Sequence, residues 1–99
     1  MDYRLTRESQ GPTLVMEGRF VHKDFAKIKE LVAQLKQGGG TSGLTLDLAG
    51  IEFIDSAGIG MLLLIREELG GGITLRGAKG QPAQLLVNAH MDQLFRLAN

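Results

Sequence analysis

The stretch LTLDLAGIEFIDSAGIGMLLLI, residues 44–65, contains the two periodic patterns that decide the fold. Its first five residues alternate leucine with threonine and aspartate, which is the period of a β-strand with one apolar face. Residues 49–54 are expected to connect this strand to a helix that begins at about Ser56. The helix is expected to end at about Leu69, because glycines occupy positions 70–72. The stretch therefore predicts a strand followed by a helix, with Ser56 at the junction.

Three other stretches alternate in the same way and are expected to form strands. They lie at residues 3–6, 14–17 and 73–76. Polar residues hold every second position in them, whereas parallel sheets covered on both faces usually have continuously apolar strands. We therefore predict a two-layer α/β fold, in which helices pack on one face of a mixed four- to five-stranded sheet and the other face is comparatively polar.

Two further helices are predicted around this stretch. Apolar residues recur at helical spacing from about Asp24 to Gln37, with glycines following at 38–40. Pro82 suits the first turn of a helix that reaches about His90. The tail, residues 93–97, is expected to be either a short edge strand or a helical turn.

The order of these elements predicts how the strands pair. A short turn near Gly11 and Pro12 joins the first two strands, which are expected to form a hairpin. Helices separate the later strands, so these are expected to be parallel and joined by right-handed crossovers.

The glycine-rich loop at residues 38–43 is expected to be flexible. No repeat or linker indicates a second domain, so residues 1–99 are predicted to form a single domain.

Composition excludes several classes of function. Eleven basic and eleven acidic side chains give a net charge of zero, which provides no electrostatic footprint for nucleic acid. The chain has no cysteine, which removes disulfides and thiolate chemistry. The longest apolar run, residues 57–65, is far shorter than the ~20 residues that span a bilayer, and the charged N-terminus is not a secretory signal. We expect a cytoplasmic protein without direct membrane insertion.

Motifs of common enzyme classes are missing from the sequence. There is no P-loop, the glycines at 58 and 60 do not continue into a dinucleotide-binding motif, and Ser56 is not in a GxSxG context. His22 and His90 are too few and too far apart to suggest a metal site, and neither has a readable relation to Ser56. We predict a protein that is not an enzyme, with no catalytic residue, no metal and no cofactor.

Ser56 is the residue through which control is expected. Either Asp55 or Ser56 can cap the helix by accepting a hydrogen bond from a free backbone N–H. A phosphate on Ser56 would instead meet the positive end of the helix dipole and add charge to a docking surface without unfolding the domain. Gly58 and Gly60 favour this functional interpretation, because each costs roughly 1 kcal/mol relative to alanine in a helix interior and suggests close approach by another backbone or by a partner.

Two other parts of the sequence have alternative interpretations. The helix over residues 56–69 is apolar nearly all round, which a central position between flanking helices mostly explains, and the remainder is a candidate partner-facing patch. The lysines at 23, 27 and 29 are either a solvated helix face or a guide for an acidic partner.

These residues resemble a known family. The run IDSAGIG at residues 54–60, which follows the LTLDL strand, is similar to the signature of STAS-domain anti-sigma factor antagonists, also called anti-anti-sigma factors. The segments MEGRF at 16–20, the leucine pair at 85–86 and QLFRL at 93–97 also resemble that family. The resemblance covers nearly the whole chain and implies the STAS fold.

The resemblance also implies a function in bacterial signal transduction and transcription regulation. In that family the unphosphorylated protein binds a GHKL-type serine kinase that is also the anti-sigma factor. Phosphorylation of the serine releases the kinase, and a PP2C-type phosphatase removes the phosphate. By this resemblance Ser56 is the phosphorylation site. The implied partner-binding residues are Val21, which stands where many relatives carry aspartate, together with His22, Asp55, Ser56, Ala57, Gly58, Gly60 and Met61.

Two other functions stay open at this point. STAS accessory subunits of membrane transport systems, such as lipid-export ATPase complexes, share the fold and can carry a hydroxyl at the same helix start. Co-purification with an ATPase or permease would identify that function. A small enzyme is the other alternative, although the sequence supplies no paired acid and base groups.

Overall fold

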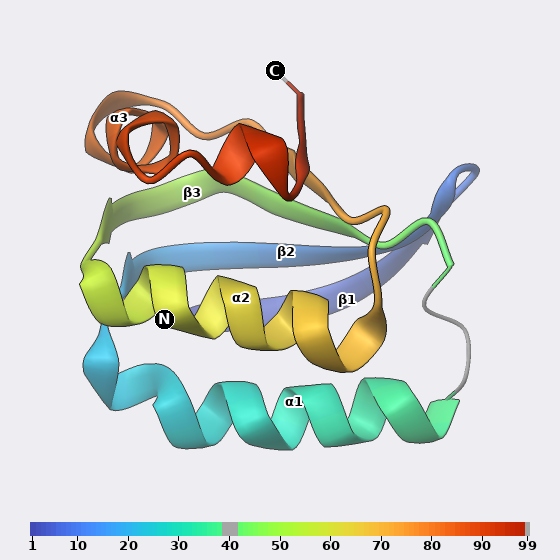
Figure 1. Ribbon diagram of the computed structural model, residues 1–99. Helices are drawn as coiled ribbons and strands as arrows, with labels where there is room; N and C mark the ends of the chain where they lie inside the picture. Colours follow the sequence, from blue (N-terminus) through green and yellow to red (C-terminus); the bar gives the residue numbers. More distant parts are fainter. Residues whose placement is uncertain (39–41, 99) are drawn as a thin grey trace.

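In residues 1–38 and 42–98, the part of the chain that the computed structural model describes, five strands form one mixed sheet (Figure 1). Their spatial order, β1-β2-β3-β4-β5, is the same as their order in the chain. β1 and β2 pair antiparallel as the predicted hairpin, and β2 to β5 are parallel. The strands are β1 (Asp2–Glu8), β2 (Gly11–Phe20), β3 (Thr45–Ile54), β4 (Thr74–Arg76) and β5 (Arg96–Ala98).

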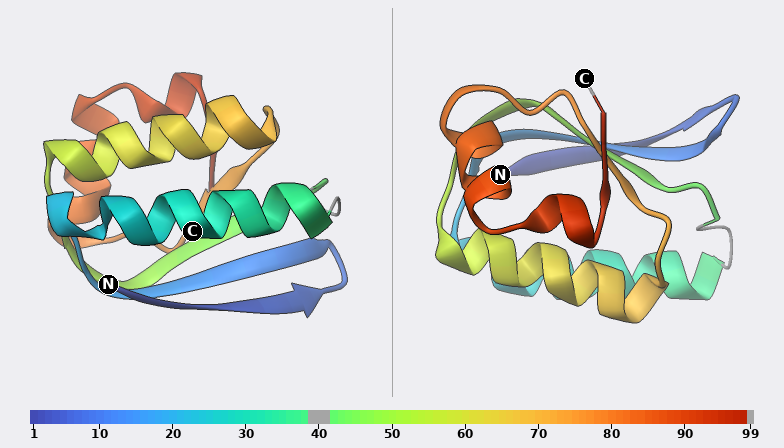
Figure 2. Two further views of the ribbon diagram at one scale, coloured as in Figure 1. Left: turned by 90° about the horizontal axis from the view of Figure 1, so that it is seen from below. Right: turned by 45° about the horizontal axis from the view of Figure 1, so that its top comes forward.

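The helices lie in a second layer against one face of this curved sheet (Figures 1 and 2). α1 and α2 run side by side, and both begin at the same end of the molecule. The helices are α1 (Phe25–Gly38), α2 (Ser56–Leu69) and α3 (Gly80–Asn88), with 3-10 turns η1 (His22–Asp24) and η2 (Met91–Gln93). Half of the loop predicted to be flexible, residues 39–41 of 38–43, lies outside the described residues.

The helix-facing side of the sheet carries the apolar half of the predicted alternation. Leu14, Leu46 and Leu75 pair across β2, β3 and β4, and all three are buried. They join one core with Ile28 of α1 and Leu62 of α2. The prediction of a two-layer α/β fold with helices on one face is confirmed. The alternation explains this arrangement, because it places the apolar side chains of each strand on the face that the helices cover.

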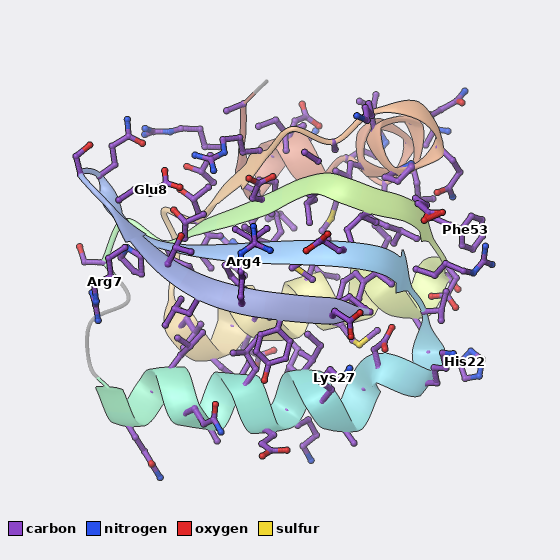
Figure 3. All side chains as sticks on the ribbon, turned by 180° about the vertical axis from the view of Figure 1, so that it is seen from behind. Arg4, Arg7, Glu8, His22, Lys27 and Phe53 are labelled. Carbon is purple, nitrogen blue, oxygen red and sulfur yellow. The ribbon has the colours of Figure 1, made fainter. Side chains whose placement is uncertain are left out.

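The opposite face of the sheet is polar and carries ion pairs (Figure 3). Arg4 Nη1 lies 2.9 Å from Glu17 Oε1 across the hairpin. Arg76 in β4 pairs with Asp47 at 2.9 Å and with Glu8 near the hairpin tip at 3.1 Å. These contacts satisfy charged side chains on a face that none of the described helices covers.

The strand in the deciding stretch is longer than predicted. β3 continues to Ile54, so the expectation that residues 49–54 form a connection was wrong. The β2–β3 ladder shifts register twice, between Val15 and Glu17 and between Gly18 and Arg19, before it ends. These irregularities absorb the sequence AGIE, which interrupts the apolar alternation and therefore hid the continuing strand.

The C-terminal tail contains both predicted alternatives in succession. The η2 turn precedes the short edge strand β5, which pairs with β4. α3 has Pro82 in its first turn, as predicted, and ends at Asn88, two residues earlier than expected.

Among the described residues, no helix is both long enough and apolar enough to cross a membrane.

Candidate functional site

The junction between β3 and α2 forms a corner at one end of the molecule (Figure 1). β2 and β3 end together, with Phe20 paired to Ile54. The Asp55 N–H then donates to the Phe20 carbonyl at 3.4 Å. This places the start of α2 directly beside η1, which leads into α1.

Asp55 is the cap of α2. Its Oδ1 accepts a hydrogen bond from the Gly58 N–H at 2.8 Å, and its Oδ2 accepts one from the His22 N–H at 3.1 Å. Burial alone would raise the pKa of the Asp55 carboxyl, but the Gly58 and His22 N–H groups outweigh it and lower that pKa below its ordinary value. Asp55 is therefore a carboxylate that ties α2 to η1.

Ser56 is the first residue of α2 and is exposed. The sequence left open whether Asp55 or Ser56 caps the helix, and the structure assigns the cap to Asp55. Within the described residues, no hydrogen bond involves the Ser56 side chain, so capping does not account for its hydroxyl. A hydroxyl in this position is accessible to a modifying enzyme or to a docking protein.

Gly58 is required by packing inside the chain. A Cβ at this position would lie 2.7 Å from the Phe20 carbonyl oxygen and 2.6 Å from Ile54 Cγ2. The predicted close approach by another backbone is confirmed for Gly58, and that backbone belongs to β2. Because Gly58 is buried, it supports the corner from inside instead of lying on its surface.

Gly60 has the opposite surroundings. It is exposed, and among the described residues no atom would lie within 4 Å of a Cβ placed there. Close approach by another backbone of this chain therefore does not explain Gly60. The alternative, close approach by a partner protein, stays open.

The remaining predicted partner-binding residues divide into two groups. His22 is exposed, with its Nδ1 3.8 Å from Asp55 Oδ2, and Val21 is half-buried next to it. These two join the surface around Ser56, as does the half-buried Ala57. Met61 is buried and packs in the core, so the structure does not place it on this surface.

Sequence reasoning missed Gln81, which braces the corner from α3. Its Nε2 donates to the Ile54 carbonyl at 2.8 Å, and its Oε1 accepts from the Ile54 N–H at 2.9 Å. The amide thus satisfies both backbone groups of the last residue of β3. No sequence signal links the two residues, because they lie 27 positions apart.

The described residues offer no metal centre, since no three His, Asp or Glu side chains lie close enough together to hold an ion. The His22 imidazole faces Asp55, the residue that precedes Ser56. The corner is therefore an exposed hydroxyl on a rigid support, with a carboxylate and an imidazole beside it.

Comparisons with known proteins identify the class. A family model described as "Mlab, STAS domain" matches residues 3–97. The chain belongs to the STAS-domain family. It is 30% identical over 97 residues to a STAS-domain containing protein of Pseudomonas aeruginosa, covering 92% of this chain and 91% of that protein.

Solved structures with the same fold include anti-sigma factor antagonists. A Thermotoga maritima protein assigned as an anti-sigma factor antagonist has a TM-score of 0.80 at 16% identity, over 98% of this chain and 86% of that one. The anti-sigma factor antagonist SpoIIAA, unphosphorylated, has a TM-score of 0.71 at 16% identity, over 99% and 88%. The phosphorylated form of SpoIIAA, described as a Bacillus cell fate determinant, gives 0.71 at 16% identity, over 99% and 92%.

Proposed function

We propose that this protein is a phosphorylation-controlled binding module, an anti-sigma factor antagonist without enzymatic activity that acts in the cytoplasm. Its unphosphorylated form binds a GHKL-type serine kinase that is also an anti-sigma factor, and phosphorylation of Ser56 releases it. A PP2C-type phosphatase reverses the modification. The observation that carries this proposal is the exposed Ser56 hydroxyl at the first position of α2, next to a cap that Asp55 already supplies.

The capping role of Asp55 explains how a phosphate would act. Because the Asp55 carboxylate already accepts from the Gly58 N–H, a phosphate on Ser56 would stay at the surface beside a second negative group. A phosphoserine carries about −1.5 to −2 charges at neutral pH. It would weaken docking of a partner on the corner by charge repulsion and by the cost of desolvating the phosphate, with the fold unchanged.

The comparison with SpoIIAA supports a switch of this kind. Its phosphorylated and unphosphorylated structures resemble this chain equally, each with a TM-score of 0.71. A fold that is the same in both forms fits a switch that acts through surface charge.

The decisive test is phosphorylation with the cognate kinase and ATP, followed by intact-mass and peptide mass spectrometry. We expect one phosphate, on Ser56, and none on Ser56→Ala. In a pull-down, Ser56→Asp should lose the kinase, whereas Ser9→Asp should retain it, because Ser9 is an exposed serine in the turn between β1 and β2. A phosphate at another residue, or equal binding by both aspartate variants, would contradict the switch.

A second candidate function is an accessory subunit of a membrane transport complex of the lipid-export ATPase type. The matching family model carries the name Mlab and not that of an anti-sigma factor antagonist, which favours keeping this candidate. Here the same exposed corner would dock on an ATPase. Affinity purification of the tagged protein from solubilised membranes separates the two: an ATPase or permease in stoichiometric amount supports the transport function, and a soluble kinase supports the switch.

A further inference from the structure

A groove runs between α1 and α2 on the side away from the sheet. Its volume is about 370 Å³, and it is open to solvent. Val32, Ala33 and Leu64 give it an apolar floor, and Lys29 and Lys36 line it from α1. Glu68 lines its far end and pairs with Lys36 at 3.0 Å.

The spacing along α2 extends this groove to the candidate site. Ser56, Gly60, Leu64 and Glu68 follow one another at intervals of four residues, so each is the neighbour of the next on the helix surface and together they form an inclined row along α2. At 1.5 Å per residue, the stripe from Ser56 to Glu68 is ~18 Å long, which matches about three turns of a helix. Gly60 leaves the middle of the stripe without a side chain, so a helix backbone can approach it closely.

Exposed apolar side chains also occur on both helices that form the groove. Phe25 at the start of α1 is 50% exposed, and Leu63 on α2 is 39% exposed. Large apolar residues exposed beside an apolar groove are typical of a protein interaction surface. The groove has the form that accepts an amphipathic helix through its apolar face.

The charge on α1 selects the kind of helix. Lys27, Lys29 and Lys36 are exposed on α1, and Glu30 is the one acidic residue of that helix. Lys29 Nζ lies 5.6 Å above the Phe25 ring, which leaves its ammonium at the rim of the groove. Because Lys36 is paired with Glu68, Lys29 is the lysine lining the groove that has no ion pair among the described residues. A positive charge beside an apolar floor is complementary to a helix with acidic residues flanking its apolar face.

We propose that the groove between α1 and α2 binds an acidic amphipathic helix of the partner protein. This deepens the proposed function, because it names the chemistry of the segment that docks beside Ser56. The partner helix lies along α2, with small apolar residues against Gly60 and Leu64 and acidic residues toward Lys29. A phosphate on Ser56 places negative charge at one end of the same groove and repels this helix.

NMR titration with a defined peptide tests the groove without the kinase. The probe is a capped helical peptide of about 14 residues, with leucine and alanine on one face and glutamate on the other. A matched peptide carries lysine in place of glutamate. We expect the acidic peptide to shift the amide signals of Lys29, Ala33, Gly60 and Leu64, and the basic peptide to leave them in place.

Four variants identify the contacts. Lys29→Glu should weaken binding of the acidic peptide about tenfold, and Gly60→Leu, which fills the stripe, at least about tenfold. Ser56→Asp should weaken it about threefold, because its charge lies at the end of the groove. The control Arg4→Glu makes the same two-unit change of charge on the sheet face opposite the helices (Figure 3) and should change the affinity less than about twofold.

The outcomes separate this proposal from the proposed function. Equal binding of both peptides, shifts confined to other surfaces, or a dimer in sedimentation equilibrium that buries the groove would each overturn the acidic-helix site. If the peptide binds as expected and no kinase phosphorylates Ser56, the groove stands and the switch fails. If Ser56 is phosphorylated and the groove signals do not move, the switch stands and the docking site lies elsewhere.

Discussion

Gly58 and Gly60 stand two residues apart in α2, yet they face opposite surroundings. At Gly58 an added Cβ would meet the Phe20 carbonyl at 2.7 Å, whereas at Gly60 it would meet no described atom within 4 Å. The inner side of the first turns of α2 is thus closed by β2 and β3, and the outer side, with Ser56 and Gly60, is open. The same residue type holds the corner together on one side and leaves room on the other.

This difference separates residues that build the site from residues available to a partner. Gly58, Asp55 and Gln81 fix the end of β3 and the start of α2 through contacts inside the chain. Among the described residues, the Ser56 side chain makes no hydrogen bond, and a Cβ at Gly60 would meet no atom within 4 Å. Substitutions on the inner side should therefore lower stability, and those on the outer side should leave it intact and change binding.

The largest effect is expected for Gly58→Ala. The new methyl group would clash with a backbone oxygen that cannot move without disrupting the β2–β3 ladder. Overpacking of this kind costs about 1–3 kcal/mol, more than the gain in helix propensity. Urea denaturation followed by circular dichroism measures the loss. Stability equal to or above that of the wild type would show that α2 can shift away from β2.

Gln81→Ala should follow in size. It leaves the Ile54 N–H and carbonyl without their partners at 2.9 and 2.8 Å, respectively, and two hydrogen bonds correspond to about 1–2 kcal/mol. Hydrogen exchange should speed up at the Ile54 amide. Gln84→Ala, in the exposed part of the same helix, is the matched control and should leave that amide protected. An unchanged exchange rate of the Ile54 amide in Gln81→Ala would show that Gln81 does not stabilise the end of β3.

Asp55 substitutions test the cap and its charge separately. Asp55→Ala should cost about 1 kcal/mol at neutral pH, because the Gly58 N–H loses its acceptor. The pKa of Asp55 is lowered from 3.8, so its charge stabilises the fold above that pH, and this contribution disappears as the pH falls through the folded pKa. The free energy of unfolding of the wild type should exceed that of Asp55→Asn at pH 7. This difference should be smaller in urea curves measured below the ordinary aspartate pKa of 3.8. An advantage that grows in acid would contradict a stabilising carboxylate.

Gly60→Ala should have the smallest effect on stability and the opposite sign. Alanine enters open space and removes the helix penalty of glycine, so the free energy of unfolding should rise by about 0.5–1 kcal/mol. Thermal unfolding by calorimetry measures this gain, with Gly58→Ala as the contrasting variant. A loss of stability at Gly60 would mean that the two sides of α2 do not differ as the structure indicates.

The sequence predicted the elements with regular periods and missed those without one. The leucine alternation before the site and the helical period of α2 led to a strand followed by a helix, and the structure has both. The end of β3 was missed because residues 49–52 follow no period and the ladder there shifts register. Gly50 lies at this irregularity, where an added Cβ would be 3.2 Å from the Met16 carbonyl oxygen.

Within the candidate site, the local contacts could be predicted and the distant ones could not. A cap of α2 from Asp55 or Ser56 follows from their position before the helical pattern. The contacts of His22 with Asp55 and of Gln81 with Ile54 join residues 33 and 27 positions apart, which only the folded topology brings together. The docking role of Val21, His22, Asp55, Ser56, Ala57 and Gly60 stays a prediction.

The identity of spatial and sequential strand order has a consequence for synthesis of the chain. Each new strand of the sheet pairs with the strand made just before it, so no strand must insert between two that have already paired. The hairpin can form first, and each strand–helix–strand unit can then dock as it leaves the ribosome, with each step joining strands that are neighbours in the chain. Arg76, which pairs with Glu8 across 68 positions, ties the first part of the nascent chain to β4 only when the sheet is nearly complete.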